Sequence, residues 1–274
     1  MVRTLNNIII DIYNMTDRPY YGFPIFFIII SVFKIIPFIL FIFICIFLNF
    51  PWYILFFIVL INLLIIYKLI IKGKEFKNFQ LSQVNKIVNL LNLTDNEVIL
   101  DLGTGSGILA ITQAKYTPNG KVFAIDQWNW PIKFLITSPL LLSSLMMGCT
   151  KKDAKKNARI EKVIDRCIFI NGDFTNKLNF TNNYFDIISS MQSLYFIKSE
   201  VKQKILFKEI DRILKIGGKI ILHEPNRTIT NYNWNLDNVI NFYKNIGYKM
   251  KIYPVEKERH WKINSSILIG IKIK

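Results

Sequence analysis

The apolar and polar positions divide the chain into two parts with different patterns. Residues 23–71 are almost wholly apolar, and Pro51 interrupts the run. A membrane-spanning helix needs about 20 apolar residues, so the run is long enough for two helices, at 25–48 and 52–71. Because proline cannot continue a helix but suits its first turn, the pattern predicts a transmembrane hairpin.

Charged and aromatic residues set the expected orientation of this hairpin. Lys34 is accommodated either by a shorter helix that begins near Ile35 or by a tilt that lets the lysine snorkel. Aromatic residues that suit a membrane interface lie near the segment ends: Trp52, Tyr53 and Tyr67. Lysines follow the second segment: Lys68, Lys72, Lys74 and Lys77. They favour a multi-pass membrane protein whose downstream domain faces the cytosol.

The sequence disfavours two alternatives to the hairpin. A cleaved signal peptide is disfavoured because the apolar run is too long, starts late and lacks a small-residue cleavage site. A pair of buried helices in a soluble protein is disfavoured because apolar length is the main criterion for a spanning helix. The expected organisation is therefore a membrane anchor at 1–74 and a soluble domain at 75–274.

Strand-like and helix-like runs alternate in the soluble domain. Strands are expected at 98–101, 121–126, 167–171, 185–190, 219–223, 248–255 and 267–273. Helices are expected at 108–115, 150–160, 199–214 and 235–246, with Thr150 and Asp153 as a capping box and Gly217-Gly218 as a C-cap. The alternation predicts a parallel sheet with helices on both faces. The last two strands have no helix between them and should be antiparallel to each other.

Composition changes this picture little. The net charge of +16 would suit nucleic acid or an anionic membrane face. The lysines are scattered and form no basic-aromatic cluster, so a coding bias is the simpler interpretation and no nucleic-acid partner is expected. The three cysteines lie far apart without C-x-x-C spacing. They therefore indicate neither a zinc site nor a disulfide framework, and no metal site is expected.

The candidate chemistry centres on 98–107, VILDLGTGSG, where a predicted strand meets a predicted helix. Glycine at 103, 105 and 107 permits positive φ and lets a ligand approach the bare backbone. A dinucleotide fingerprint would need its third glycine at Ile108. Asp101 would repel a pyrophosphate but attract a cationic ligand such as S-adenosylmethionine (SAM).

Two further acids end predicted strands at the same edge of the sheet. Asp126 is suited to accept hydrogen bonds from ribose hydroxyls. Asp173 is suited to accept from an adenine amino group, with Phe174 beside it to pack on the ring. The alternative for each acid is a loop acid or a helix cap. That alternative is weaker for three acids at the ends of consecutive predicted strands.

Residues 97–223 resemble a class I SAM-dependent methyltransferase. The resemblance lies in VILDLGTGSG, VFAID, NGDF, FDIISS and EIDRILKIGGKIIL, and AIDQW with DAKKNA is similar to a branch of small-molecule methyltransferases. It implies an α/β fold with a Rossmann-like seven-stranded sheet, mostly parallel with its last strand antiparallel, and SAM as cofactor. Ile216 departs from the family, which usually has proline before the two glycines.

The resemblance also implies roles for individual residues. Asp101 and the glycine loop (Gly103, Gly105 and Gly107) would hold the methionine end of SAM, and Asp126 the ribose. Asp173 and Phe174 would contact the adenine. Met191 and Gln192, after the fourth strand, would line the methyl-donor site.

Methyl transfer from a sulfonium needs mainly alignment and a dry site. A base is needed only where the acceptor must lose a proton, and the candidates are His223, Glu224 and Tyr195. The alternative for His223 is a structural histidine.

The apolar insert 127–149 is too short to span a bilayer and is broken by Pro131 and Pro139. It is either an interfacial cap that admits a hydrophobic acceptor from a membrane or a cap packed on the domain's own helices.

The expected function is therefore a membrane-anchored methyltransferase that acts on a small-molecule or lipid acceptor. One alternative is a SAM-binding membrane protein without catalysis, a sensor or scaffold, because fold does not fix function. A nicotinamide-dependent oxidoreductase is disfavoured by Ile108 and Asp101.

Overall fold

The computed structural model describes residues 52–128, 150–226, 234–255 and 264–274, together with Pro19, Phe43 and Phe47. Apart from Phe43 and Phe47, the predicted first span, 25–48, lies outside these residues, as does most of the insert 127–149. Within the described parts of the chain, no helix combines the length and the apolar character needed to cross a membrane.

Helix α3 (Trp52–Leu91) is one continuous helix of 40 residues. It begins at the predicted residue, but the predicted end at residue 71 is wrong, and the predicted boundary after residue 74 falls inside the helix. The link from 72 to 80 contains no proline and a single glycine, which a helix tolerates at a cost of about 1 kcal/mol. The chain divides into two compact units within α3, after Ser82.

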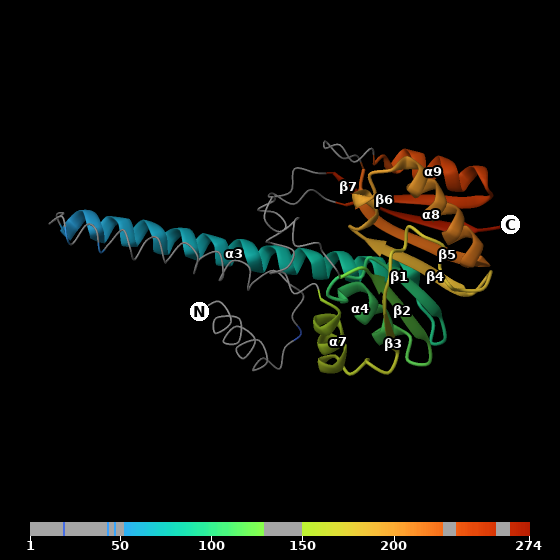
Figure 1. Ribbon diagram of the computed structural model, residues 1–274, viewed down its shortest axis with the longest axis horizontal. Helices are drawn as coiled ribbons and strands as arrows, with labels where there is room; N and C mark the ends of the chain where they lie inside the picture. Colours follow the sequence, from blue (N-terminus) through green and yellow to red (C-terminus); the bar gives the residue numbers. More distant parts are fainter. Residues whose placement is uncertain are drawn as a thin grey trace. The chain divides into compact units, whose positions relative to one another are not determined.

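Seven strands form one sheet in the order β3-β2-β1-β4-β5-β7-β6 (Figure 1). The strands are β1 (Val98–Leu102), β2 (Lys121–Asp126), β3 (Cys167–Asn171), β4 (Phe185–Met191), β5 (Leu214–Pro225), β6 (Tyr248–Pro254) and β7 (Ser265–Lys272). Strands β1 to β5 pair in parallel, whereas β7 is antiparallel to both β5 and β6. The predicted mostly parallel sheet and its antiparallel last strand are confirmed.

The helices of the domain are α4 (Ile108–Tyr116), α7 (Lys151–Ile160), α8 (Glu200–Ile213) and α9 (Leu236–Asn245), with the short 3-10 helix η1 (Leu194–Phe196). The predicted capping box of α7 is confirmed, because Thr150 and Asp153 each bond the other's backbone N–H. The predicted glycine C-cap of α8 is wrong. Buried Leu214 pairs with Phe185 and draws the chain straight into β5, so Gly217 lies in an irregularity of that strand.

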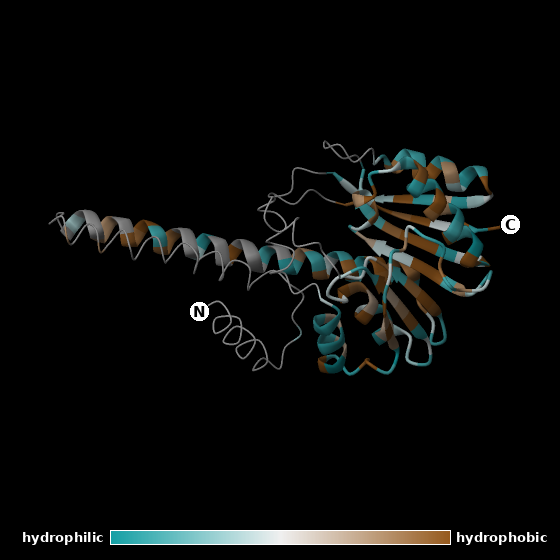
Figure 2. Ribbon diagram, in the orientation of Figure 1, coloured by the Kyte–Doolittle hydropathy of each residue, from teal (hydrophilic) through white to brown (hydrophobic). Residues whose placement is uncertain are grey.

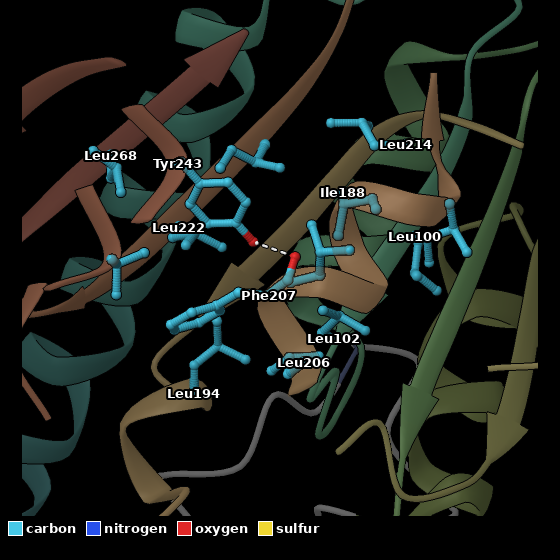
Figure 3. Packing of buried hydrophobic residues seen from close by; sticks show 14 of the residues in the cluster. Leu100, Leu102, Ile188, Leu194, Leu206, Phe207, Leu214, Leu222, Tyr243 and Leu268 are labelled. Atoms are coloured by element: carbon cyan, nitrogen blue, oxygen red, sulfur yellow. Dashed lines mark hydrogen bonds between the residues drawn. The ribbon is translucent and has the colours of Figure 1, made fainter. Parts of the chain in front are cut away.

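Helices α8 and α9 cover one face of the sheet with a continuous apolar core (Figure 3). The strands contribute Leu100, Leu102, Ile188, Ile220, Leu222 and Leu268. The buried Tyr243 hydroxyl donates to the Phe207 carbonyl at 3.5 Å. Figure 2 shows the strands mainly in the hydrophobic colour, as expected for a sheet buried on both faces.

The last turns of α3 lie on the opposite face of the sheet. Lys219 of β5 donates through Nζ to the Leu91 carbonyl at the end of α3. Successive side chains of a strand point to opposite faces. His223 therefore shares the α3 face with Lys219, whereas Leu222 and Glu224 share the face covered by α8.

Arg212 of α8 clamps the chain that follows β3. Its guanidinium bonds both carboxylate oxygens of Glu209 and donates to the carbonyls of Leu178 and Phe180. Lysine cannot form this planar set of bonds. We expect Arg212→Lys to lower the free energy of unfolding by about 2 kcal/mol in urea denaturation. Arg159→Lys, on an exposed position of α7, is the control, and equal losses in both variants would contradict the clamp.

Candidate functional site

The strand order reverses between β1 and β4. Strands β2 and β3 extend the sheet on one side of β1, and β4 and β5 extend it on the other. In open α/β sheets, ligands bind outside the carboxyl ends of the strands at such a switch point. The glycine loop after β1 and the segment after β4 both begin there.

The glycine loop has the backbone geometry that its sequence predicts. Gly103, Gly105 and Gly107 have φ of 74°, 54° and 87°. The N–H of Gly103 donates to the Ile125 carbonyl at 2.8 Å, which pins the loop to β2. A Cβ on Gly103 would lie only 2.3 Å from the Cβ of Ser193. The bare backbone of Gly103 is therefore packed directly against the segment after β4.

Asp126 holds the loop from the end of β2. Its Oδ2 accepts from the Gly105 N–H at 2.8 Å, and its Oδ1 accepts from the Trp128 N–H at 3.1 Å. The indole N–H of Trp128 donates in turn to the Gly105 carbonyl at 2.9 Å. Sequence reasoning missed Trp128 as a residue of the site. The available signal was its position in AIDQW, two residues after the acid.

Asp101 lies beneath the loop and is only 1% exposed. Its Oδ1 accepts from the Ser189 hydroxyl at 3.0 Å, whereas its Oδ2 has no partner among the described residues. Burial raises the pKa of this carboxyl to about 6. The unpartnered oxygen is the atom through which Asp101 could meet a polar ligand group or a water, so its predicted contact with the methionine end stays a prediction.

Asp173 and Phe174 follow β3 at the same edge of the sheet. Oδ1 of Asp173 accepts from the Thr175 N–H and hydroxyl at 2.9 and 2.7 Å. Burial opposes ionisation of Asp173, but the bonds from Thr175 and Gln127 and the charge of Lys202 together outweigh it and lower the pKa of this carboxyl. The Phe174 ring lies 3.7 Å from the position that a Cβ on Gly103 would take. The structure thus brings Phe174 to the glycine loop.

The segment after β4 turns sharply at Gln192. This residue has φ of 55°, which is uncommon outside glycine, and its N–H donates to the His223 carbonyl at 2.8 Å. Met191 and Gln192 are both half-buried. The Ser193 hydroxyl donates to the Leu102 carbonyl at 2.8 Å. Sequence reasoning missed Ser193, because its partner lies 91 residues away in the chain.

The three candidate bases lie in different surroundings. His223 and Glu224 are both 0% exposed, and as consecutive strand residues they point to opposite faces. Burial lowers the pKa of His223 to about 4, and its Nε2 lies 3.2 Å from the Ser265 hydroxyl. Glu224 contacts the segment after β4, where half-buried Tyr195 also lies. Their use as bases stays a prediction.

The residues at this edge fit SAM in three respects. Gly103 offers bare backbone, Asp101 has a buried oxygen without a partner among the described residues, and the acids Asp126 and Asp173 lie at the ends of the neighbouring strands β2 and β3. Among the described residues, no group of three or more His, Cys, Asp or Glu side chains is arranged to hold a metal ion.

Comparison with known proteins identifies a related domain. Residues 142–222 match the family described as the methyltransferase domain, a stretch that includes α7, β3, β4 and α8 but not the glycine loop. The uncharacterized methyltransferase C1B3.06c of Schizosaccharomyces pombe is 29% identical over 126 residues, which are 46% of this chain and 39% of that protein. The chain therefore spans about two fifths of the length of the curated relative that it matches.

Solved structures share the fold at low identity. The YcgJ protein of Bacillus subtilis is 14% identical, with a TM-score of 0.51 over 70% of this chain and 98% of that chain. The [4+2]-cyclase SpnF is 16% identical, with a TM-score of 0.52 over 70% and 81%. Phosphoethanolamine N-methyltransferase 2 of Haemonchus contortus, in complex with S-adenosylhomocysteine, is 18% identical, with a TM-score of 0.50 over 70% and 53%. These similarities show the Rossmann-like methyltransferase fold.

Proposed function

We propose that residues 83–274 bind SAM and transfer its methyl group to an acceptor. The observation that carries the proposal is the glycine loop at the switch point of the sheet, closed on one side by Asp126 and on the other by Ser193. The match of residues 142–222 to the methyltransferase domain supports the same activity.

In this proposal, residues of the chain bind SAM and orient it. The glycine loop and Asp101 hold the methionine end, Asp126 the ribose, and Asp173 with Phe174 the adenine. Asp126 can do so while bonded to Gly105 and Trp128, because a carboxylate has about four acceptor positions and two are used here. SAM supplies a methyl group that is already activated on its sulfonium. The protein therefore contributes mainly alignment and exclusion of water.

Cofactor binding gives the direct test. We expect isothermal titration of the purified protein with SAM to give saturable one-to-one binding, and titration with NAD to give none. Asp126→Asn should weaken SAM binding at least about tenfold, because its amide nitrogen would face the backbone N–H of either Gly105 or Trp128. Binding of NAD in preference to SAM would contradict the proposal.

We further propose that the chain attaches to a membrane through residues 25–71. In α3, large apolar side chains are exposed at spacings of three and four residues: Tyr53, Phe56, Phe57, Leu60, Ile61, Leu64 and Tyr67. This spacing puts them on one helix face, and exposed apolar side chains gathered on one face are typical of an interaction surface. The lysines that follow favour a lipid surface with the domain on the cytosolic side. A small-molecule or lipid acceptor fits this location.

A second candidate function is that of a SAM-binding sensor or scaffold that transfers no methyl group. One observation favours it. The [4+2]-cyclase SpnF has the same fold, so this fold also supports chemistry other than methyl transfer. Incubating membranes that contain the protein with methyl-labelled SAM separates the two. A labelled product supports the transferase, and SAM binding without any labelled product supports a SAM-binding sensor or scaffold.

A further inference from the structure

Glu224, near the end of β5, accepts several hydrogen bonds from Ser190 and from the segment after β4. Its Oε1 accepts from the Ser190 hydroxyl at 2.9 Å and from the N–H groups of Ser193 and Leu194, both at 3.1 Å. Its Oε2 lies 3.5 Å from the N–H of Tyr195. Three successive backbone N–H groups thus converge on one carboxylate that is 0% exposed. Buried N–H groups need a hydrogen-bond acceptor, and the ionised carboxylate accepts stronger hydrogen bonds than the protonated form does.

The same segment carries the contact to the glycine loop. Ser193 sits between Glu224 and β1, with its N–H on Glu224 and its hydroxyl on the Leu102 carbonyl at 2.8 Å. The hydroxyls of Ser190 and Ser193 are 2.8 Å apart. Gly103, which follows Leu102, has no room for a Cβ because Ser193 occupies that space. A shift of the segment after β4 would therefore reach the loop directly.

We propose that Glu224 is a positioning residue, whose ionised carboxylate fixes the segment after β4 against the glycine loop and so sets the affinity for SAM. This inference rests on the proposed function. In this proposal Glu224 does not act as the predicted base, because it affects SAM only through Ser193 and the glycine loop.

The surroundings of Glu224 place its protonation near neutral pH. Burial raises the pKa of this carboxyl to about 7, and the bonds from Leu194, Ser193 and Ser190 only partly offset that rise. Tyr195 is the titratable group on the facing segment, and Ser266 is the partner from β7. His223 points to the other face of the sheet. The largest contributions to the shift come from burial and from these hydrogen bonds.

The test is SAM affinity as a function of pH. In wild type, the Kd should fall about tenfold from about pH 6 to about pH 8, because the ionised form makes the stronger hydrogen bonds. Glu224→Gln keeps the shape but cannot ionise, so it should bind at both pH values as wild type does at the lower one. The ratio of the Kd of wild type to that of Glu224→Gln at each pH cancels any effect of the titration of SAM itself.

Asp186→Asn is the matched control. Asp186 also accepts a backbone N–H, from Val98 at 2.9 Å, but at the other end of β4. This variant should keep the wild-type pH dependence of SAM affinity.

Ser193→Ala keeps the backbone bond to Glu224 but removes the bond to Leu102 and the hydroxyl contact with Ser190. It should weaken SAM binding several-fold, so the proposal can still be tested if Glu224→Gln does not fold.

Stability distinguishes positioning from a structural role. The folded pKa of Glu224 is raised above its usual 4.5. The protonated carboxyl of Glu224 therefore stabilises the folded protein. This stabilisation is fully present below pH 4.5 and is lost as the pH rises through about 7. At about pH 8, Glu224→Gln should melt at the same temperature as wild type or higher, whereas a purely structural residue would melt lower.

The outcomes separate the two claims. A wild-type protein that binds no SAM overturns the proposed function and, with it, the positioning role. A wild-type protein that binds SAM with the same affinity and pH dependence as Glu224→Gln overturns the positioning role alone.

Discussion

Gly103→Ala is expected to weaken SAM binding at least about a hundredfold while the domain stays folded. Two effects add at this position. The residue has φ of +74°, where a side chain costs about 1 to 3 kcal/mol. Its new Cβ would also lie 2.3 Å from the Cβ of Ser193, so the segment after β4 must move. Calorimetric titration with SAM and thermal melting measure the two consequences separately.

Gly217→Ala is the matched control for this prediction. Gly217 has nearly the same φ, +80°, but nothing lies within 4 Å of its added Cβ. It should lose stability through backbone strain and keep its SAM affinity. The double variant Gly103→Ala/Ser193→Gly removes the collision but not the strain, so it should recover part of the affinity. Equal SAM affinities of Gly103→Ala and Gly217→Ala would show that the close approach to Ser193 does not matter.

Replacing Phe56, Phe57 and Leu60 together by serine is expected to release the protein from lipid. Each of these side chains is at least 40% exposed on α3. Burying a large apolar side chain is worth about 1.5 to 3 kcal/mol. Three losses should therefore reduce partitioning by about a thousandfold or more. Flotation with liposomes of phosphatidylcholine and phosphatidylserine measures the bound fraction.

Three exposed apolar residues of the sheet-containing unit provide the control: Val201, Ile205 and Ile216. Replacing them by serine removes a similar number of exposed apolar side chains but leaves α3 intact. This variant should float with the liposomes as wild type does. Retention of the α3 variant on the liposomes would contradict attachment through the exposed face of that helix.

The sheet was largely predictable because its signals are local. Short apolar runs located every strand, and the lack of a helix between β6 and β7 predicted that they pair antiparallel. The Thr150 and Asp153 capping box is likewise contained within four residues. The positive φ values of the glycine loop followed from three glycines at alternate positions.

Features that depend on distant partners were not predictable in this way. The Gly217-Gly218 pair indicates a turn, but Leu214 is drawn into β5 by pairing with Phe185. The sequence marks Glu224 as a candidate base but does not reveal its hydrogen-bond partners, which come from 29 to 34 residues earlier in the chain. The predicted end of α3 at residue 71 is wrong because it relied on a local change in hydropathy. Hydropathy changes after residue 71, yet no local signal stops the helix there.

The bond between Ser193 and Leu102 also has a consequence during synthesis. The two residues lie 91 positions apart, and chains are made at about 5 to 20 residues per second. The glycine loop therefore waits about 5 to 18 s for the serine that braces it. Parallel pairing of β1 with β4 must close the same span, and non-local contacts of this kind form slowly. The ligand site therefore cannot be complete until the chain has been synthesised past Ser193.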